Sequence, residues 1–354
     1  MERYAHHVFQ MVGLDPHLLL PMKLLIYAVY RLVRTIILLE SDLYTLARRL
    51  IQQEKAGNVE FFNIITRYRL DATDVAQDHD FLIFNDGFGT IGDLSDPCWL
   101  IYSITERYVY FVRIPDDPPL SMSFTQKLTL LLHNSADRVA RIDIKDFSNE
   151  AKSRFPASKG RVVMLHNAPC CGGSMLGRLL SSSDLTQRHV LVLGEPPALS
   201  ALAVLAQIVS IEVMRSVTLA SLRYIMRHLE SDQVVVMKTS WRLLEPEMVQ
   251  KIGPKEAYEF ALAQIMGCTI NHQRNLKYYA LEAIYAEDLM NDPLTVVRPV
   301  LDVCGLSNAA LTNIRRWKSQ EETAMQSTPS TPLNEAQRQR VKLLVEYLQQ
   351  DWCR

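Results

Sequence analysis

The sequence predicts an α/β protein in which an N-terminal accessory region precedes a larger domain built around a parallel sheet. Residues 1–70 have the apolar spacing of helices, and residues 80–147 contain short β-like runs separated by turn residues. From residue 158 onward, strand-like and helix-like segments alternate, as they do in domains with a parallel sheet. We therefore divide the chain into an accessory region, residues 1–157, and an α/β domain, residues 158–354.

The net charge and the cysteines of the chain limit which partners we expect. The chain has 354 residues, 48% of them hydrophobic, which is enough for a large core. Its formal net charge of -1 gives no general attraction to nucleic acid, so we expect no nucleic-acid partner. The 6 cysteines lack the paired C-x-x-C spacing of structural zinc sites. We therefore expect no metal, a reducing compartment and a cytoplasmic location.

Residues 18–39 are apolar enough to raise the question of a membrane anchor, which would imply a Golgi protein. Lys23, Arg31 and Arg34 interrupt the run, so we predict no transmembrane span. The helical period places Tyr27 on one stripe with these three cations. The other side carries apolar residues, namely Leu25, Ala28, Val29, Leu32 and Ile36. We predict an amphipathic helix packed on the body of the protein, and contact with a membrane surface is the alternative.

Helix caps and short apolar runs predict the elements between this helix and residue 158. Residues 41–54 predict a helix that starts at Ser41 or Asp42 and stops at Gly57. Three runs, "DFLIFND", "CWLIYSI" and "RYVYFVRI", predict the strands of a small sheet. The turns "DGFGTIGD" and "PDDPP" separate them. This part of the chain is therefore expected to form an accessory sheet after the N-terminal helices.

A glycine-rich turn opens the α/β domain. The apolar strand "RVVML" leads into "HNAPCCGGSMLGRLL", residues 166–180, whose second half has a helical pattern. A turn of this kind gathers backbone N–H groups at a helix N-terminus, where the helix dipole favours an anion. Gly172 and Gly173 let an anion approach closely, and Ser174 adds a hydroxyl donor. No Walker A lysine is present, which argues against a P-loop ATPase or kinase.

Two further strands each end at a chargeable group. "HVLVLGEPPAL" ends at Gly194-Glu195, and "QVVVMKTS" ends at Lys238-Thr239. Ligands of open parallel sheets bind at the carboxyl ends of the strands, so Ser174, Glu195 and Lys238 are expected to converge. Downstream, "YAEDLMNDP" precedes "LTVVRPVLDVCGL", which predicts an amphipathic helix that closes at Gly305.

Taken in order, "HNAPCCGGSML", "LGEPPAL", "VVVMKTS" and "YAEDLMNDPLTVVRPVLDVCGL" resemble the motifs of the sulfotransferase family. Members of this family transfer sulfonate from the nucleotide donor PAPS (3′-phosphoadenosine 5′-phosphosulfate) to a hydroxyl or amine. The resemblance covers roughly residues 159–325. It implies a P-loop-like, three-layer α/β domain around a central parallel sheet, with PAPS as donor, a small-molecule or carbohydrate hydroxyl as acceptor, and no metal.

The resemblance also implies roles for residues. The donor would bind along the first turn, at Pro169, Cys170, Cys171, Gly172, Gly173, Ser174 and Met175. Lys238 would stabilise the charge that develops during transfer, and Glu195 would act as the base for the acceptor. An ion pair between Lys238 and Glu195 is the structural alternative for both residues. Glu287 and Asp288 match a motif that is mainly structural in the family.

Two departures from the family pattern keep a second hypothesis open. Cys170 stands where the family usually has an arginine or lysine, and residues 241–281 show no strand ending in the arginine that binds the 3′-phosphate. Arg274, or Lys318 with Ser319, are weak substitutes, whereas Arg113 or Arg161 directed into the cleft would restore a cation. The alternative function is a catalytically degenerate sulfotransferase-like binding module with an incomplete 3′-phosphate site.

Overall fold

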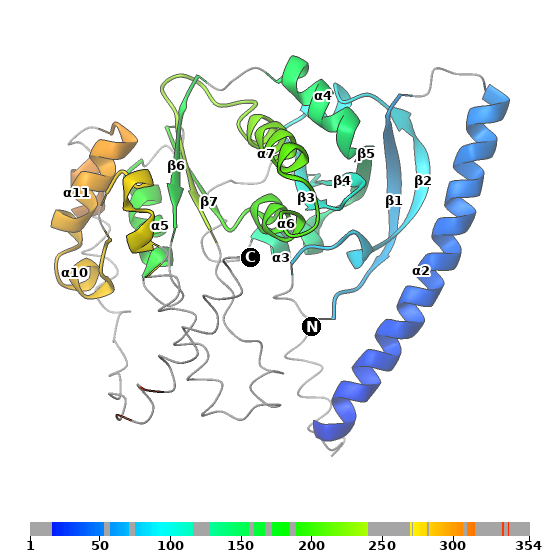
Figure 1. Cartoon of the computed structure of the whole chain (residues 1–354), viewed down its shortest axis with the longest axis horizontal. Coiled ribbons are helices and arrows are strands. Elements are labelled where there is room, and N and C mark those ends of the chain that lie inside the picture. The colour runs from blue at the N-terminus through cyan, green and yellow to red at the C-terminus, as the bar shows by residue number, and fades with distance from the viewer. Residues whose placement is uncertain are drawn as a thin grey trace. The chain divides into compact units, whose positions relative to one another are not determined.

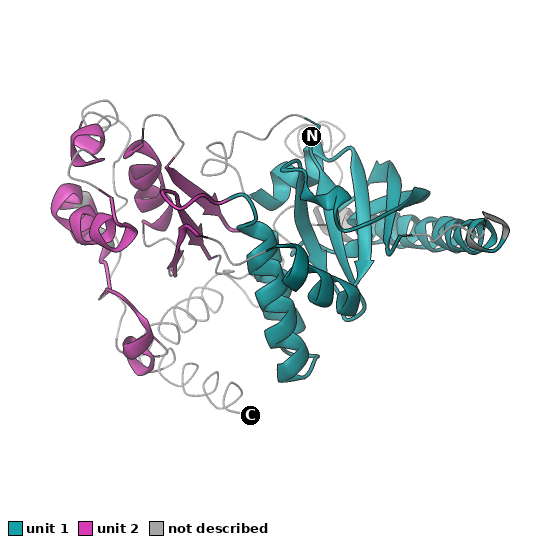
Figure 2. Cartoon of the chain, turned by 90° about the horizontal axis from the view of Figure 1, so that it is seen from above, with its two compact units in different colours: residues 1–118, 126–158, 197–228 teal, residues 119–125, 159–196, 229–354 magenta. Residues whose placement is uncertain are grey.

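The protein is an α/β protein with two compact units. The computed structural model describes residues 16–52, 57–70, 75–115, 128–155, 159–166, 172–184, 189–239, 270, 272–281, 283–306, 310–315, 335 and 339. Unit 1 comprises residues 1–118, 126–158 and 197–228, and unit 2 comprises residues 119–125, 159–196 and 229–354 (Figure 2). The predicted division placed a single cut after residue 157. It differs from the observed one because residues 197–228 fold with unit 1.

Unit 1 is built on a five-stranded antiparallel sheet with the order β2-β1-β5-β4-β3 (Figure 1). Its strands are β1 (Val59–Arg67), β2 (Phe81–Gly89), β3 (Trp99–Ile104), β4 (Tyr108–Arg113) and β5 (Arg138–Asp143). The three predicted runs form β2, β3 and β4, so the small accessory sheet is confirmed. The expectation that residues 1–70 are helical is wrong at β1, which lies between β2 and β5.

Helices cover both faces of this sheet. One face packs on α4 (Ile144–Arg154), α6 (Pro197–Leu205) and α7 (Ile211–Ile225) in a core that includes Phe111, Phe147 and Tyr224. The other face packs on α3 (Leu128–Ser135), with Leu132 fully buried and Leu38 of α2 (Pro16–Gln52) against the same cluster. Short 3-10 helices, η1 (Asp78–Asp80) and η2 (Asp93–Ser95), precede β2 and β3. The sheet therefore has two separate apolar cores, one on each face.

Helix α2 packs through its polar side, which corrects the predicted orientation. Arg34 is buried, and its guanidinium donates to the carbonyl of Phe81 at 3.1 Å and to the carbonyl and carboxylate of Asp78 at 2.9 and 3.1 Å. The side chains expected to pack, including Leu25, Leu32 and Ile36, are exposed instead. Buried hydrogen bonds to a guanidinium are stronger than neutral ones, and here they fix the helix to the strand.

The same helix also runs through the predicted second start. Ser41 is buried inside α2, where its hydroxyl accepts a hydrogen bond from the backbone N–H of Asn85 at 2.9 Å. Asp42 pairs with Arg141 of β5 at 2.7 Å. Neither residue caps a helix, so the prediction of a second helix beginning there is wrong. Within the part of the chain that the structure describes, no helix combines the length and apolar character needed to cross a lipid bilayer.

Unit 2 contains a three-stranded parallel sheet with the order β6-β8-β7. All three predicted strands are confirmed, as β6 (Arg161–Leu165), β7 (Val190–Gly194) and β8 (Val234–Lys238). Its core joins the sheet to α5 (Gly173–Ser182) and α11 (Pro293–Cys304), with Leu289 of α10 (Ala286–Asn291) packed against them. A short 3-10 helix, η4 (Leu276–Tyr278), lies earlier in the chain. The α/β class is therefore confirmed by the parallel sheet and its helices.

The end of α11 confirms the predicted stop at Gly305. This glycine has φ 72° and follows the last helical turn, and the N–H of Leu306 bonds to the carbonyl of Leu301 at 2.9 Å. Asp292 caps the other end, where its carboxylate accepts from the N–H of Thr295 at 3.3 Å. These are the sequence signals of a Schellman stop and an Asp N-cap.

Replacing Gly305 by alanine is expected to destabilise unit 2 by about 1–2 kcal/mol, because an L-residue at this left-handed φ is strained. The new Cβ would also lie 2.8 Å from Nη1 of Arg161, which donates to the carbonyl of Val303 at 2.7 Å. Urea unfolding measures the effect. Gly87→Ala is the control, since its Cβ meets no atom within 4 Å, and we expect a change within about 0.5 kcal/mol there. Equal effects of the two substitutions would contradict the prediction.

Candidate functional site

The candidate site lies at the carboxyl edge of the parallel sheet in unit 2. The register of the strands pairs Leu165 with Lys238 and Lys238 with Gly194. The pattern continues past the strand ends, since the N–H of Thr239 bonds to the carbonyl of Leu165 at 3.0 Å and that of Glu195 bonds to the carbonyl of Lys238 at 2.9 Å. Residues that follow three different strands are therefore held side by side, as is usual where parallel sheets bind ligands.

Lys238 is the central residue of this edge. Its side chain is only 9% exposed, and Nζ lies 3.1 Å from Oγ of Ser174 and 3.1 Å from Oε1 of Glu195. The structure thus brings together the three side chains that were expected to converge, Glu195 and Lys238 from strand ends and Ser174 from the first turn of a helix. A buried ammonium is costly unless it is paired, and Glu195 supplies the opposite charge. Two of the three ammonium protons are used in these contacts, and the described residues show no third acceptor.

Glu195 has an unusual backbone. Its φ of 54° is the only positive φ at a non-glycine residue in the described part of the chain. A left-handed conformation costs an L-residue about 1–2 kcal/mol. The hydrogen bond from its N–H and the ion pair of its carboxylate with Lys238 both hold it there. Backbone strain of this kind gathers at functional sites, where it fixes the direction of a side chain.

Helix α5 begins beside the ammonium group. Gly172 is its N-cap in the left-handed region, with φ 81° and ψ 6°, and the first helical bond runs from the N–H of Leu176 to the carbonyl of Gly172 at 3.0 Å. Gly173, Ser174 and Met175 therefore occupy the first turn, whose N–H groups have no partner within a helix. The helix dipole adds partial positive charge beside Lys238. Pro169, Cys170 and Cys171 lie outside the described residues.

Several aromatic and imidazole rings adjoin this edge. Nδ1 of His166, the residue after β6, lies 3.3 Å from Oγ1 of Thr239. Its ring is 6.4 Å from that of Tyr279, which in turn stacks edge-on against His272 at 4.3 Å. Burial, together with the nearby His272, lowers the pKa of His166, so it is neutral at physiological pH. Sequence reasoning missed His272 and Tyr279, because they lie in a segment without a motif and far from the strand ends.

The cations that could have completed the site are used elsewhere or lie outside the described residues. Arg161 donates to the carbonyl of Val303 beside the end of α11, and Arg113 pairs with Asp137 at 2.9 Å in unit 1. Arg274 is exposed just before η4. Lys318 and Ser319 lie outside the described residues, as does most of the interval 241–281. Within the part described, Lys238 is therefore the cation of the site.

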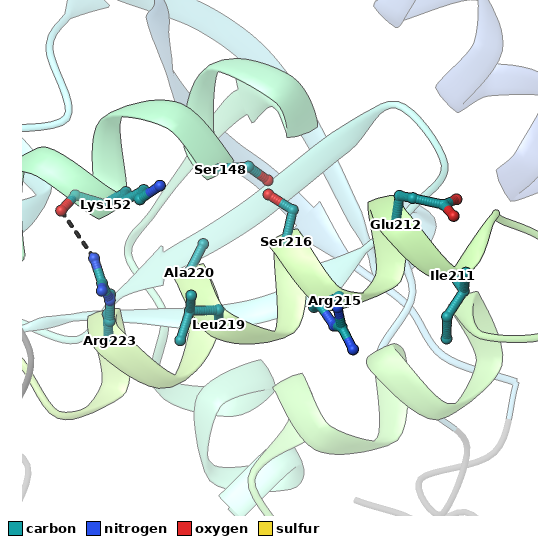
Figure 3. A pocket seen from close by; sticks show the side chains of 9 residues that line it. All are labelled: Ser148, Lys152, Ile211, Glu212, Arg215, Ser216, Leu219, Ala220 and Arg223. Carbon is teal, nitrogen blue, oxygen red and sulfur yellow. Dashed lines mark hydrogen bonds between the residues drawn. The ribbon is translucent and has the colours of Figure 1, made fainter.

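A pocket of about 350 Å³ lies elsewhere, in unit 1 between α4 and α7 (Figure 3). Its lining includes the apolar Leu219 and Ala220 and the basic Lys152, Arg215 and Arg223. The guanidinium of Arg223 donates to the carbonyl of Lys152 at 2.9 Å. None of the residues predicted for the donor or for catalysis lines this pocket, so it is separate from the candidate site.

No family model matches the chain, and a search of curated proteins finds no relative.

Proposed function

We propose that the carboxyl edge of the parallel sheet in unit 2 binds the phosphosulfate end of PAPS and transfers its sulfonate to a hydroxyl acceptor. The observation that carries the proposal is the ammonium of Lys238, buried at the start of α5 and in contact with both Ser174 and Glu195. The first-turn amides, the Ser174 hydroxyl and this ammonium all favour an anion. On this proposal, unit 2 has the P-loop-like, three-layer fold of the sulfotransferase family.

The proposed reaction uses the two charged side chains in different ways. The acceptor oxygen attacks sulfur and its proton passes to the Glu195 carboxylate, while the bond between sulfur and the phosphate oxygen breaks. The electron pair of that bond stays on adenosine 3′,5′-bisphosphate, the leaving group. Lys238 would stabilise the negative charge that grows on the leaving oxygen, because aligned cations and hydrogen-bond donors are the main catalytic tools in transfers of this kind.

The ion pair has a consequence for this reaction. While Glu195 contacts Lys238, the two charges cancel, and an arriving anion gains mainly from the third ammonium proton and the helix amides. An incoming anion that draws the ammonium away from Glu195 would free the carboxylate to accept a proton. Donor binding would then prepare the base, so the proposal predicts that nucleotide binding depends on Lys238 even though Lys238 is already paired.

A binding module without transfer is the second candidate. The observation that favours it is the engagement of Arg161 with the carbonyl of Val303 and of Arg113 with Asp137, since Lys238 is then the cation at the described edge where the family usually has several. Such a module would still bind the nucleotide. Transfer of labelled sulfonate from PAPS to a panel of hydroxyl compounds separates the two candidates, since only the enzyme gives a labelled product.

Calorimetric titration with adenosine 3′,5′-bisphosphate tests the shared binding step. We expect micromolar affinity, with Lys238→Met weakening it about 10–150-fold, the range for one charge-assisted hydrogen bond. Lys159→Met is the matched control, because Lys159 is exposed in the same unit. This variant should bind adenosine 3′,5′-bisphosphate with the same affinity as the unmodified protein. An absence of heat at millimolar nucleotide, or equal affinity of the Lys238→Met variant, would contradict both candidates.

A further inference from the structure

The outward side of α2 carries a continuous apolar stripe with a seven-residue period. Leucines recur at Leu25, Leu32, Leu39 and Leu46. Each is more than half exposed, at 66, 63, 59 and 55%. A seven-residue spacing is the signature of coiled coils, in which the recurring residue occupies position d of the heptad abcdefg. In a straight helix, residues seven positions apart drift slowly around the surface. Two helices that coil around each other keep such residues in contact along their whole length.

The positions between these leucines complete the pattern. With leucine at d, position a is occupied by Val29, Ile36, Leu43 and Leu50, which are 54, 58, 61 and 72% exposed. In the first half of the seam, leucine at d combines with the β-branched residues Val29 and Ile36 at a, which is the combination that favours two parallel strands over three or four. No polar residue occurs at a or d from Leu25 to Leu50. The stripe is therefore a complete coiled-coil seam without a partner in the described chain.

The body of unit 1 lies on the side of α2 away from the seam. Tyr27, Arg34 and Ser41 occupy position f, the position farthest from a and d, and Arg34 and Ser41 bond to residues of η1 and β2. In Figure 1, α2 lies along the edge of unit 1 next to β2, with its other side facing away from the sheet. A second helix could therefore pack on the seam without meeting the sheet of unit 1.

We infer that α2 forms a parallel two-stranded coiled coil with α2 of a second copy of this chain, so that the protein is a dimer joined through residues 25–50. The flanking positions support a parallel pairing. Residues at g face residues at e of the partner helix five positions on, which joins Thr35 to Glu40 and Asp42 to Ala47, so no like charges meet. Asp42 is in addition neutralised by Arg141 of its own chain.

The exposed apolar area of the seam approaches that of a specific dimer interface. A large aliphatic side chain contributes roughly 60–120 Å² when it is fully removed from water. Ile26 and Val33, at position e, are also 48 and 41% exposed. With the eight seam residues, they could bury roughly 700–1,400 Å² over two protomers. That range reaches the lower end of the area found in specific interfaces, about 1,200–2,000 Å², before any polar atom is counted.

A membrane surface fits the same stripe less well. Helices that lie on membranes keep a face rich in lysine and arginine toward the headgroups and water. Here the polar face turns toward the sheet of its own chain, where Arg34 and Ser41 bond to residues of η1 and β2.

The oligomeric state of the full chain tests the inference. We expect a dimer in sedimentation equilibrium at micromolar concentration, and Leu32→Glu should weaken it by about 100-fold or more, because a carboxylate replaces a buried leucine in both helices. Leu24→Glu is the matched control. Leu24 is 46% exposed on the same helix, at position c outside the seam, so this variant should remain dimeric. Both leucines are exposed in the single chain, so circular dichroism should be unchanged in both variants.

Three results would overturn the inference. The first is a protein that stays monomeric at every concentration up to about 100 µM, which is well above the dissociation constant expected for a seam of this size. The second is a dimer that Leu32→Glu and the milder Leu39→Gln both leave intact. The third is a monomer that co-sediments with phosphatidylcholine–phosphatidylserine vesicles and loses this binding on Leu32→Glu, which would assign the stripe to a membrane.

A cysteine variant tests whether the two helices run parallel. With Leu32→Cys, an added mild oxidant should crosslink two chains, because equivalent d positions face each other only in a parallel pair.

Discussion

Replacing Tyr224 by alanine is expected to lower the free energy of unfolding of unit 1 by about 3–5 kcal/mol, the range for removing a buried aromatic ring. Tyr224 is fully buried on α7, and its ring contacts those of Phe111, Phe147 and Phe155 at centroid distances of 4.9, 6.2 and 5.3 Å. The guanidinium of Arg227 lies over the same ring, 4.0 Å from its centre. Removing the ring therefore opens a cavity and unpairs a cation–π contact.

A second variant separates the ring from its hydroxyl. The hydroxyl of Tyr224 lies 2.8 Å from the carbonyl of Leu94 and 3.0 Å from that of Trp99. Tyr224→Phe should therefore cost about 0.5–1.5 kcal/mol, the contribution of one hydrogen bond. Hydrogen exchange of peptides from β3 and β4 follows the opening of unit 1 directly. Tyr278, which is 75% exposed in unit 2, supplies the control Tyr278→Ala. Equal costs for Tyr224→Phe and Tyr224→Ala would refute the packing argument.

Under the proposed function, Glu195→Gln is expected to reduce the rate of sulfonate transfer by about 10²–10⁴-fold, the usual contribution of a general base. An amide keeps the shape of the side chain and can still accept a hydrogen bond from Lys238, but it cannot take a proton from the acceptor. Removing the carboxylate also removes the charge that competes with an incoming anion. Affinity for adenosine 3′,5′-bisphosphate should therefore be unchanged or somewhat tighter, while turnover falls.

The test of Glu195→Gln needs both the rate of sulfonate transfer and the affinity for the nucleotide. Rates of labelled sulfonate transfer and calorimetric affinities are compared for the same protein samples. Glu287→Gln is the matched control, because Glu287 is exposed on α10 in the same unit and its loss should change neither quantity. A variant at Glu195 that retains full turnover would remove the base from the mechanism, and one that loses nucleotide binding would show that the carboxylate supports the fold of the site.

The sequence was sufficient to predict those parts of the site that lie at the carboxyl ends of strands. Short apolar runs bounded by turn residues identified β6, β7 and β8, and parallel strands bring their carboxyl ends to one edge whatever the connections between them. That rule is sufficient to place Glu195 near Lys238, and the turn after β6 brings Ser174 to the same edge. The left-handed φ of Glu195 had no sequence signal, because a glutamate followed by two prolines predicts only a turn or a helix start.

The orientation of α2 could not be read from its own pattern. An amphipathic helix normally buries its apolar side, and that rule failed because partners distant in the sequence satisfy the polar side. Arg34 bonds to Asp78 and Phe81, and Ser41 bonds to Asn85, each more than forty residues away. The strand β1 was missed for a related reason. Its sequence follows a long helical stretch directly, and only pairing with β2 and β5 defines it.

The path of the chain between the two units sets the order in which the protein can be completed during synthesis. Residues 159–196 belong to unit 2, yet unit 1 also requires residues 197–228, which carry α6, α7 and the Tyr224 cluster. At about 5–20 residues per second, a ribosome needs roughly 4–14 s to progress from residue 158 to residue 228. Throughout that interval the nascent sheet of unit 1 exposes the apolar face that α6 and α7 later cover. Chaperone engagement of ribosome-bound chains should therefore be greatest in this window and decline once α7 has emerged.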